Sequence, residues 1–124
     1  MSLTIHYREK NKIGVFRLEG IKSSSDAMDA WVRFMLALGK NSIKAILVFD
    51  NSIIATTPAD VSNIAEELMK NNCPKNKKIA IVAPSSINFL RNSLGETVMF
   101  IKGWDNIKVF DDEIGAMEWL KAPL

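Results

Sequence analysis

The stretch Lys78-Ile-Ala-Ile-Val-Ala-Pro84 decides the class of fold. The residues between its two ends are all apolar, which is typical of a strand in a parallel sheet whose faces are both covered. Downstream come an apolar-periodic stretch, the short run Ile107-Lys-Val-Phe110 and a segment that contains Ala116-Met-Glu-Trp119-Leu120. This succession predicts strand, helix, strand and helix, which is the pattern of an α/β domain.

The N-terminal residues predict a β-hairpin at one edge of the sheet. Leu3, Ile5 and Tyr7 alternate with polar residues, which is the period of a half-buried strand. A second strand is predicted over 13–18, and Glu19-Gly20 is expected to close the hairpin.

Two helices flank a further apolar strand in the middle of the chain. The first helix is expected to start at Ser23-Ser24-Ser25-Asp26, whose side-chain oxygens can accept hydrogen bonds from the free N–H groups of a first helical turn. Residues 43–49 predict a buried strand that ends at Asp50, and a loop is expected over 51–57. The second helix is expected to start at Thr57-Pro58, because proline is favoured in a first helical turn.

The last two helices are predicted from N-caps and apolar spacing. Ser85 or Ser86 is expected to cap the third helix, and Asp111 or Asp112 the fourth. The third helix has an apolar stripe of Ile87, Leu90, Leu94, Val98 and Ile101, and the fourth is expected to bury Ile114, Met117 and Leu120. The whole order is ββαβαβαβα. It predicts one α/β domain over 1–124 with a mostly parallel five-stranded sheet, an N-terminal antiparallel hairpin and about four helices.

The composition is that of a globular domain with an even charge balance. Of 124 residues, 48% are hydrophobic and 24% are charged, and 16 Lys and Arg against 14 Asp and Glu give a net charge of +2. This balance argues against a nucleic-acid-binding protein. The run of Lys70, Lys75, Lys77 and Lys78 is interpreted as a solvated loop, with a patch for an anionic partner as the alternative.

The apolar runs give no targeting or membrane signal. The first residues alternate like a strand and lack the apolar core of a signal peptide. The longest apolar runs are far shorter than the roughly 20 residues that cross a bilayer. The sequence therefore predicts a cytoplasmic protein without stable membrane insertion.

No residue pattern predicts catalysis, a metal or a cofactor. His6 is the only histidine and Cys73 the only cysteine, so an intramolecular disulfide and a cysteine-based metal site are excluded. Asp111, Asp112 and Glu113 crowd one helix start, where capping and the helix dipole explain them. Glycine-rich phosphate loops and a Gly-x-Ser-x-Gly elbow are absent. We expect no enzyme; an enzyme with an unrecognised site at the strand ends is the alternative.

The strand over 79–84, the following helix, Val109-Phe110-Asp111 and Ala116-Met-Glu-Trp119-Leu120 resemble the STAS/SpoIIAA-like superfamily. The likeness is greatest to its stand-alone bacterial members, which are grouped with Sec14-like domains. The hairpin and Ile46-Leu-Val-Phe-Asp50 follow the same order, so the resemblance covers nearly the whole chain. It implies a compact α/β fold without catalysis that regulates by binding other proteins.

The resemblance also implies a regulatory position. In the signalling members, a partner kinase phosphorylates a serine of an Asp-Ser-Ser-Gly motif at the helix start after the central strand. This chain has Ala55-Thr56-Thr57-Pro58-Ala59-Asp60 there, so Thr56 and Thr57 are nearest to that serine. A phosphate at a helix N-terminus is favoured, but the simpler interpretation is that Thr57 is an N-cap.

Two candidate sites follow from these patterns. The first interpretation is a module that docks a protein partner on the 51–60 loop and the helix start, at the edge where open α/β sheets bind ligands; a homodimer is an alternative assembly. Its candidate residues are Asp50, Ser52, Thr56, Thr57, Pro58, Asp60, Ser85 and Ser86. The alternative function is binding of an apolar or lipid-like molecule in a pocket lined by Met28, Trp31, Phe34, Met35, Leu94, Val98 and Met99.

Overall fold

In the computed structural model, which describes residues 2–123, the chain follows the predicted order ββαβαβαβα. The strands are β1 (Thr4–Lys10), β2 (Ile13–Lys22), β3 (Ala45–Ile54), β4 (Lys78–Val82) and β5 (Ile107–Phe110). The helices are α1 (Ser24–Leu38), α2 (Pro58–Lys70), α3 (Ser86–Ile101) and α4 (Glu113–Lys121). Within this described part of the chain, no helix has the length and apolar character needed to span a bilayer.

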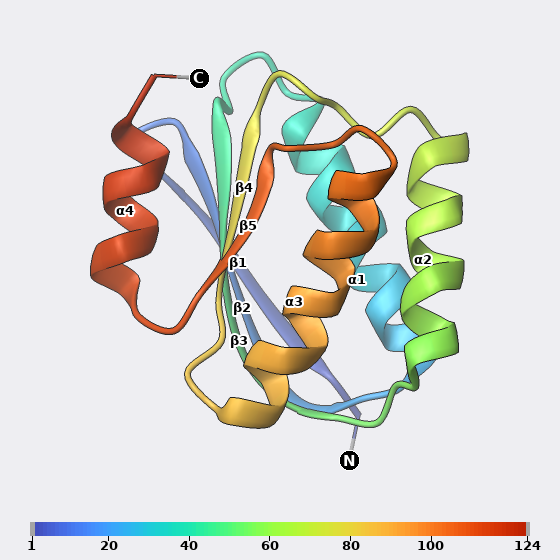
Figure 1. Cartoon of the computed structure of the whole chain (residues 1–124). Helices are drawn as coiled ribbons and strands as arrows, with labels where there is room; N and C mark the ends of the chain where they lie inside the picture. Colours follow the sequence, from blue (N-terminus) through green and yellow to red (C-terminus); the bar gives the residue numbers. More distant parts are fainter. Residues whose placement is uncertain (1, 124) are drawn as a thin grey trace.

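The strands form one sheet in the order β1-β2-β3-β4-β5. β1 and β2 pair antiparallel and the other neighbours pair parallel, which confirms the predicted sheet with its N-terminal hairpin. Helices α1, α2 and α3 cover one face of the sheet, and α4 lies on the other (Figure 1). The first three helices share a face because right-handed crossovers that advance in one direction place their helices on the same side.

The two faces of the sheet carry two separate cores. The larger core lies beneath α1, α2 and α3, and its most deeply buried side chains include Phe34, Leu38, Ile43, Ile46, Val48, Leu68 and Ile79. The smaller core lies beneath α4 and contains Val15, Leu47, Phe49, Ala80, Val82 and Ala116. Because β4 contributes to both cores, every residue of this strand is buried, as its apolar run predicts.

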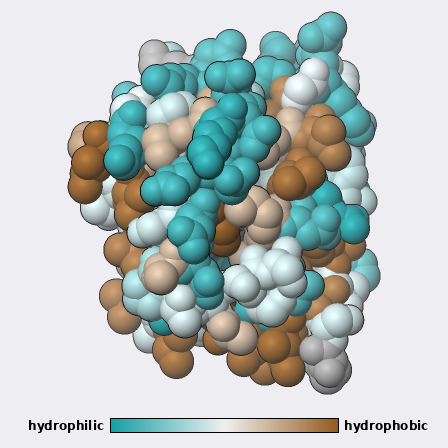
Figure 2. Space-filling view, turned by 90° about the vertical axis from the view of Figure 1, so that its right-hand side faces the viewer, coloured by the Kyte–Doolittle hydropathy of each residue, from teal (hydrophilic) through white to brown (hydrophobic). Residues whose placement is uncertain are grey.

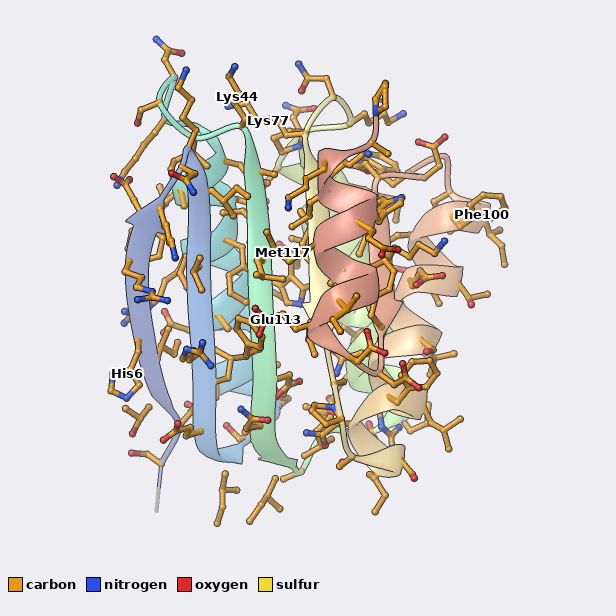
Figure 3. All side chains as sticks on the ribbon, turned by 90° about the vertical axis from the view of Figure 1, so that its left-hand side faces the viewer. His6, Lys44, Lys77, Phe100, Glu113 and Met117 are labelled. Atoms are coloured by element: carbon orange, nitrogen blue, oxygen red, sulfur yellow. The ribbon has the colours of Figure 1, made fainter. Side chains whose placement is uncertain are left out.

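Helix α4 covers only part of its face of the sheet. Figure 3 shows α4 towards the β4 and β5 side, with His6 on the uncovered β1 side. On that uncovered side, the guanidinium of Arg17 lies 4.1 Å from the centre of the Phe49 ring and shields it from water. His6 is exposed, as its position on the polar side of β1 predicts.

Strands β2 and β3 run further than predicted. β3 continues through Asn51 to Ile54, where a loop was expected, and β2 continues to Lys22, past Glu19-Gly20. The two extensions pair with each other up to Lys22↔Ile54. The prediction of a loop over 51–54 is therefore wrong. Asn51 favours a turn locally, but the ladder with β2 satisfies the backbone here.

Helix α3 faces the sheet with a different side from the one its apolar spacing suggests. Four members of the predicted stripe, Ile87, Leu90, Leu94 and Ile101, expose 68%, 69%, 36% and 74% of their surface, and we refer to these four as the α3 stripe. The buried residues of the helix are Asn88 and Met99. Amphipathic helices usually bury such a stripe. Figure 2 views the helix layer from the side of α2 and shows hydrophobic residues along the edges of that layer.

Helix α4 also departs from the prediction. Ile114, which was expected in the core, is 73% exposed, whereas Ala116 is fully buried. Met117 and Leu120 are partly buried against the smaller core. The side chain of Asp112 caps the helix by accepting a hydrogen bond from the Gly115 N–H group at 2.8 Å.

The interpretation of the lysine run as a solvated loop is wrong for Lys77 and Lys78, which bind helix C-termini, whereas Lys70 and Lys75 are exposed. Nζ of Lys77 donates a hydrogen bond to the carbonyl oxygen of Leu38, at the end of α1, at 2.6 Å. Nζ of Lys78, which is 6% exposed, donates to the carbonyl oxygen of Trp119 in the last turn of α4, also at 2.6 Å. Both ammonium groups satisfy helix C-termini, where a positive charge is stabilising.

Candidate functional site

Strand β3 extends beyond its neighbour β4 at the C-terminal edge of the sheet, and we refer to this extension as the β3 overhang. The last residue pair between them is Phe49↔Val82, whereas β3 continues to Ile54. The start of α3 lies beside this overhang, where Ser85 caps the helix by accepting a hydrogen bond from the Asn88 N–H group at 3.2 Å. The overhang leaves β3 carbonyl groups without a partner strand on this side, so another group has to satisfy them.

The side chain of Asn88 satisfies these carbonyl groups. Its Nδ2 atom donates hydrogen bonds to the carbonyl oxygens of Ser52, at 2.7 Å, and Asp50, at 3.2 Å. One turn later, Nδ2 of Asn92 donates to the carboxylate of Asp50 at 2.9 Å. Because side chains four residues apart share one face of a helix, these contacts explain why α3 turns polar residues towards the sheet.

Asp50 is a buried charge with a full set of partners. Its Oδ2 atom lies 2.6 Å from Nζ of Lys22, and Oδ1 accepts hydrogen bonds from the N–H and hydroxyl groups of Ser52. Burial by itself would raise the pKa of the Asp50 carboxyl. The Lys22 ammonium and the hydrogen bonds from Lys22, Ser52 and Asn92 outweigh burial and hold this pKa below its ordinary value. Asp50 is therefore ionised at neutral pH.

These groups support structure better than catalysis. Asp50 is 1% exposed and its lone pairs are engaged, so it is not positioned as a general base. Burial raises the pKa of the Cys73 thiol to about 11, so little reactive thiolate is present at neutral pH. Within residues 2–123, no three His, Cys, Asp or Glu side chains gather in a way that could hold a metal ion.

An open groove lies between the β3 overhang and the start of α3. Its volume is about 440 Å³, and the residues that line it include Asp50, Ser52, Ile53, Pro84, Ser85, Ile87 and Asn88. Ile53 and Ile87 expose 66% and 68% of their surface, so the groove is continuous with exposed aliphatic side chains. It lies at the edge where open α/β sheets bind ligands.

The structure divides the residues predicted for docking among several places. Asp50, Ser52 and Ser85 line the groove, Thr56 lines a separate cavity, and Ser86 is exposed at the start of α3. Thr57 and Asp60 form a capping box: Thr57 Oγ1 accepts from the Asp60 N–H group at 3.2 Å, and Asp60 Oδ2 accepts from the Thr57 N–H group at 2.8 Å. Pro58 follows in the first turn of α2. The interpretation of Thr57 as an N-cap is confirmed.

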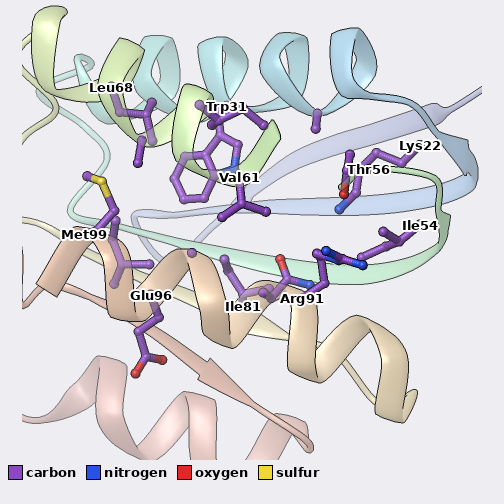
Figure 4. Close-up of a pocket in the computed structure, with 16 residues that line it drawn as sticks. Lys22, Trp31, Ile54, Thr56, Val61, Leu68, Ile81, Arg91, Glu96 and Met99 are labelled. Atoms are coloured by element: carbon purple, nitrogen blue, oxygen red, sulfur yellow. The ribbon is translucent and has the colours of Figure 1, made fainter. Parts of the chain in front are cut away.

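The separate cavity has a volume of about 60 Å³ and lies among α1, α2, α3 and the sheet (Figure 4). Of the seven residues predicted for an apolar pocket, only Trp31 and Met99 line it. Phe34 is buried in the larger core, and Met28, Met35 and Val98 pack against that core. Leu94 belongs to the exposed α3 stripe. The rest of the lining includes Lys22, Thr56, Val61, Arg91 and Gly95.

Sequence reasoning missed the residues that organise the groove and the cavity. Lys22, Asn88 and Asn92 build the network beneath the groove, and Arg91 and Gly95 line the cavity. A signal for the asparagines was present, because Asn88 and Asn92 are spaced by four residues on the face opposite the α3 stripe. No sequence signal linked Lys22 to Asp50.

Comparisons with known proteins agree with this architecture. No family model matches the chain, and no curated protein matches it. A similar solved structure is that of an uncharacterised protein from the DUF3478 family with a SpoIIAA-like fold, from Shewanella loihica PV-4. The TM-score is 0.53 at 14% sequence identity, and the match covers 96% of this chain and 94% of that one. The chain has a SpoIIAA-like fold, so the resemblance to STAS/SpoIIAA-like domains is confirmed for the fold.

Proposed function

We propose that this SpoIIAA-like domain is a non-enzymatic protein-interaction module that binds a protein partner through the α3 stripe and the adjoining groove. The observation that carries the proposal is the exposure of the α3 stripe, which places aliphatic side chains from one helix face in solvent. Contiguous exposed apolar surface of this kind marks interaction sites in many proteins. We expect the module to act as a regulator in the cytoplasm.

The dimensions of this surface suit a protein partner. From Ile87 to Ile101 the stripe runs for about 21 Å at the rise of an α-helix, and Ile53 extends it across the groove. Specific interfaces have an apolar centre within a polar rim. Thr97, which is exposed on the same helix, and Lys102, at its C-terminal end, supply polar groups beside the apolar side chains.

The buried network supports a rigid docking surface. Asn88 and Asn92 bind β3, so the helix cannot rotate to bury its stripe without breaking these hydrogen bonds. A surface that is already ordered loses less conformational entropy when a partner binds. The exposure of the stripe is therefore built into the packing of α3.

The same contacts argue against an enzyme at the strand ends. The carboxylate of Asp50, the hydroxyl of Ser52 and the amides of Asn88 and Asn92 bind one another or the β3 backbone. Groups held in this way provide no free base or nucleophile beside the groove. This supports docking, and not catalysis, as the role of the C-terminal edge of the sheet.

The proposal is tested by substituting the stripe and measuring partner capture. The double variant Ile87→Asp/Leu90→Asp places charges in the surface, and Ile114→Asp on α4 is the matched control because Ile114 is similarly exposed. Proteins that wild type captures from cells of the source organism are purified, and their affinities for each variant are measured. We expect the double variant to bind at least about 30-fold more weakly, as loss of an interface hot spot does. Equal binding by the double variant and wild type would reject the proposal.

A further inference from the structure

The cavity beneath α2 and α3 has an apolar end and a polar end. Trp31, Leu68 and Met99 line the apolar end, and Val61 lines the space between the ends. Figure 4 shows Leu68 and Met99 towards one side of the cavity and Thr56 and Arg91 towards the other. A ligand with an apolar part and a polar head therefore matches the distribution of the lining side chains.

The polar end carries groups without partners in the protein. Thr56 is only 8% exposed, and no hydrogen bond from its hydroxyl to another residue is found within 2–123. No carboxylate oxygen in this part of the chain lies within 4.0 Å of the Arg91 guanidinium. The Thr56 hydroxyl, which lines this end of the cavity, is therefore free to form a hydrogen bond with a ligand oxygen.

The other charged groups of the lining are already engaged. Lys22 forms its ion pair with Asp50. Glu96 points away from the cavity in Figure 4, and its Oε1 atom accepts a hydrogen bond from the Val109 N–H group at 2.6 Å. Among the lining residues that the structure describes, Arg91 thus carries the unpaired positive charge, which favours an anionic head group.

Gly95 gives an independent indication that the cavity is kept open. A glycine within a helix costs about 1 kcal/mol relative to alanine. Gly95 is not among the residues with positive φ, so the backbone does not require a glycine here. A methyl group at this position would meet only Val61, at the ordinary contact distance of 3.6 Å. Alanine would fit and would favour the helix, but it would narrow the cavity.

We propose that the cavity binds a short-chain aliphatic monocarboxylate, with the carboxylate at Arg91 and Thr56 and the chain between Trp31, Val61 and Met99. A water-sized group needs roughly 10–15 Å³ of such cavity volume. A cavity of about 60 Å³ therefore holds about four to six such groups. Because the carboxylate takes part of this space, only short chains of a few carbons fit. This inference is independent of partner docking, because the α3 stripe faces away from the cavity.

The test is a titration of the full-length chain with sodium n-alkanoates from acetate to octanoate, followed by NMR of the tryptophan indole N–H signals. We expect the Trp31 signal to shift saturably while those of Trp104 and Trp119, which do not line the cavity, stay in place. Affinity should rise about fourfold for each added methylene until the cavity is full, and then level off. The proposal is overturned if no alkanoate shifts Trp31, or if n-alcohols of equal chain length bind as tightly.

Two variants identify the head-group and chain positions. Arg91→Gln should weaken binding about tenfold, whereas Arg33→Gln, whose guanidinium pairs with Asp29 on the surface of α1, should bind like wild type. Gly95→Ala should raise the melting temperature and weaken binding of the longer chains several-fold, because the methyl group takes their space. Unchanged binding by Gly95→Ala and Arg91→Gln, or a lower melting temperature of Gly95→Ala, would contradict the proposed site.

Discussion

The side-chain amide nitrogen of Asn88 lies 2.7 Å from the carbonyl oxygen of Ser52, so a helix residue takes the place of a neighbouring strand. The contact joins two features of the molecule that are far apart in the sequence. It closes the edge of β3 beyond the end of β4, and it fixes which face of α3 meets the sheet. The exposed stripe on the opposite face of α3 follows from this choice.

Replacing Asn88 should destabilise the domain more than its neutral side chain suggests. Asn88→Ala leaves the buried carbonyl oxygens of Asp50 and Ser52 without donors, which costs about 2–4 kcal/mol in the free energy of unfolding. Urea denaturation measures this difference. Asn71→Ala is the control, because Asn71 also binds a carbonyl oxygen but lies exposed at the end of α2, and it should change stability by less than about 1 kcal/mol. Equal losses in the two variants would contradict the role assigned to Asn88.

The pairing of Asp50 with Lys22 should make the domain sensitive to acid. Burial by itself would raise the folded-state pKa of Asp50. The charge of Lys22, and then the hydrogen bonds, outweigh burial and hold this pKa below that of the unfolded chain. The unfolded chain therefore binds more protons in acid. This contribution to stability is present above the unfolded pKa of roughly 4 and is lost as pH falls through the lower folded pKa.

Asp50→Asn tests this linkage. At neutral pH the variant leaves the Lys22 ammonium buried without a carboxylate, which costs about 3–5 kcal/mol. Its unfolding free energy should also depend less on pH in acid than that of wild type. Asp29→Asn, which removes an exposed carboxylate on α1, is the matched control. A variant with the acid profile of wild type would show that Asp50 does not carry the effect.

The fold was predictable where local signals and tertiary structure agree. The apolar run 79–83 specified a strand buried on both faces, and Ser23, Thr57 and Ser85 mark helix starts that the structure confirms. The α3 stripe shows the limit of such reasoning. Spacing shows which residues share a helix face, but the direction of that face depends on the contacts of Asn88 with a distant strand.

The candidate site was less predictable for the same reason. Asp50 and Ser52 were identified from their place at a strand end, and the groove does form there. Their partners Lys22, Asn88 and Asn92 come from other elements. Only the register of β2 with β3 and the position of α3 on the sheet bring these partners to Asp50 and Ser52. The extension of β3 over 51–54 likewise depends on its partner strand and not on its own residues.

Tyr7, the only tyrosine of the chain, should ionise at unusually high pH. Burial raises the pKa of its phenol from 10.0 to about 12, with a further rise from the hydrogen bond and negative charge of Glu9. Titration of phenolate absorbance should give this value for the folded domain and about 10 for the urea-unfolded chain. Glu9→Gln should move the folded value down. A folded value equal to the unfolded one would contradict the described packing of the β1 edge.

Cys73 should be unreactive until the domain unfolds. Its thiol is 3% exposed, and burial raises its pKa from 9.0 to about 11. The thiolate fraction at neutral pH is therefore about 100-fold lower than in the unfolded chain, and access is blocked in addition. Stopped-flow labelling with a thiol reagent should show slow reaction of the folded domain and fast reaction in urea. Fast labelling of the folded domain would place Cys73 at the surface.

Site-specific photo-crosslinking tests the docking surface most directly. A photoreactive amino acid is placed at position 90 in the α3 stripe or, as the control, at position 114 on α4, where the side chain is similarly exposed. The domain is then illuminated in cells of the source organism, and crosslinked products are identified by mass spectrometry. We predict that position 90 forms a discrete crosslink to one protein, which is absent from position 114. The same diffuse set of products from both positions, or none from position 90, would contradict a docking role for α3.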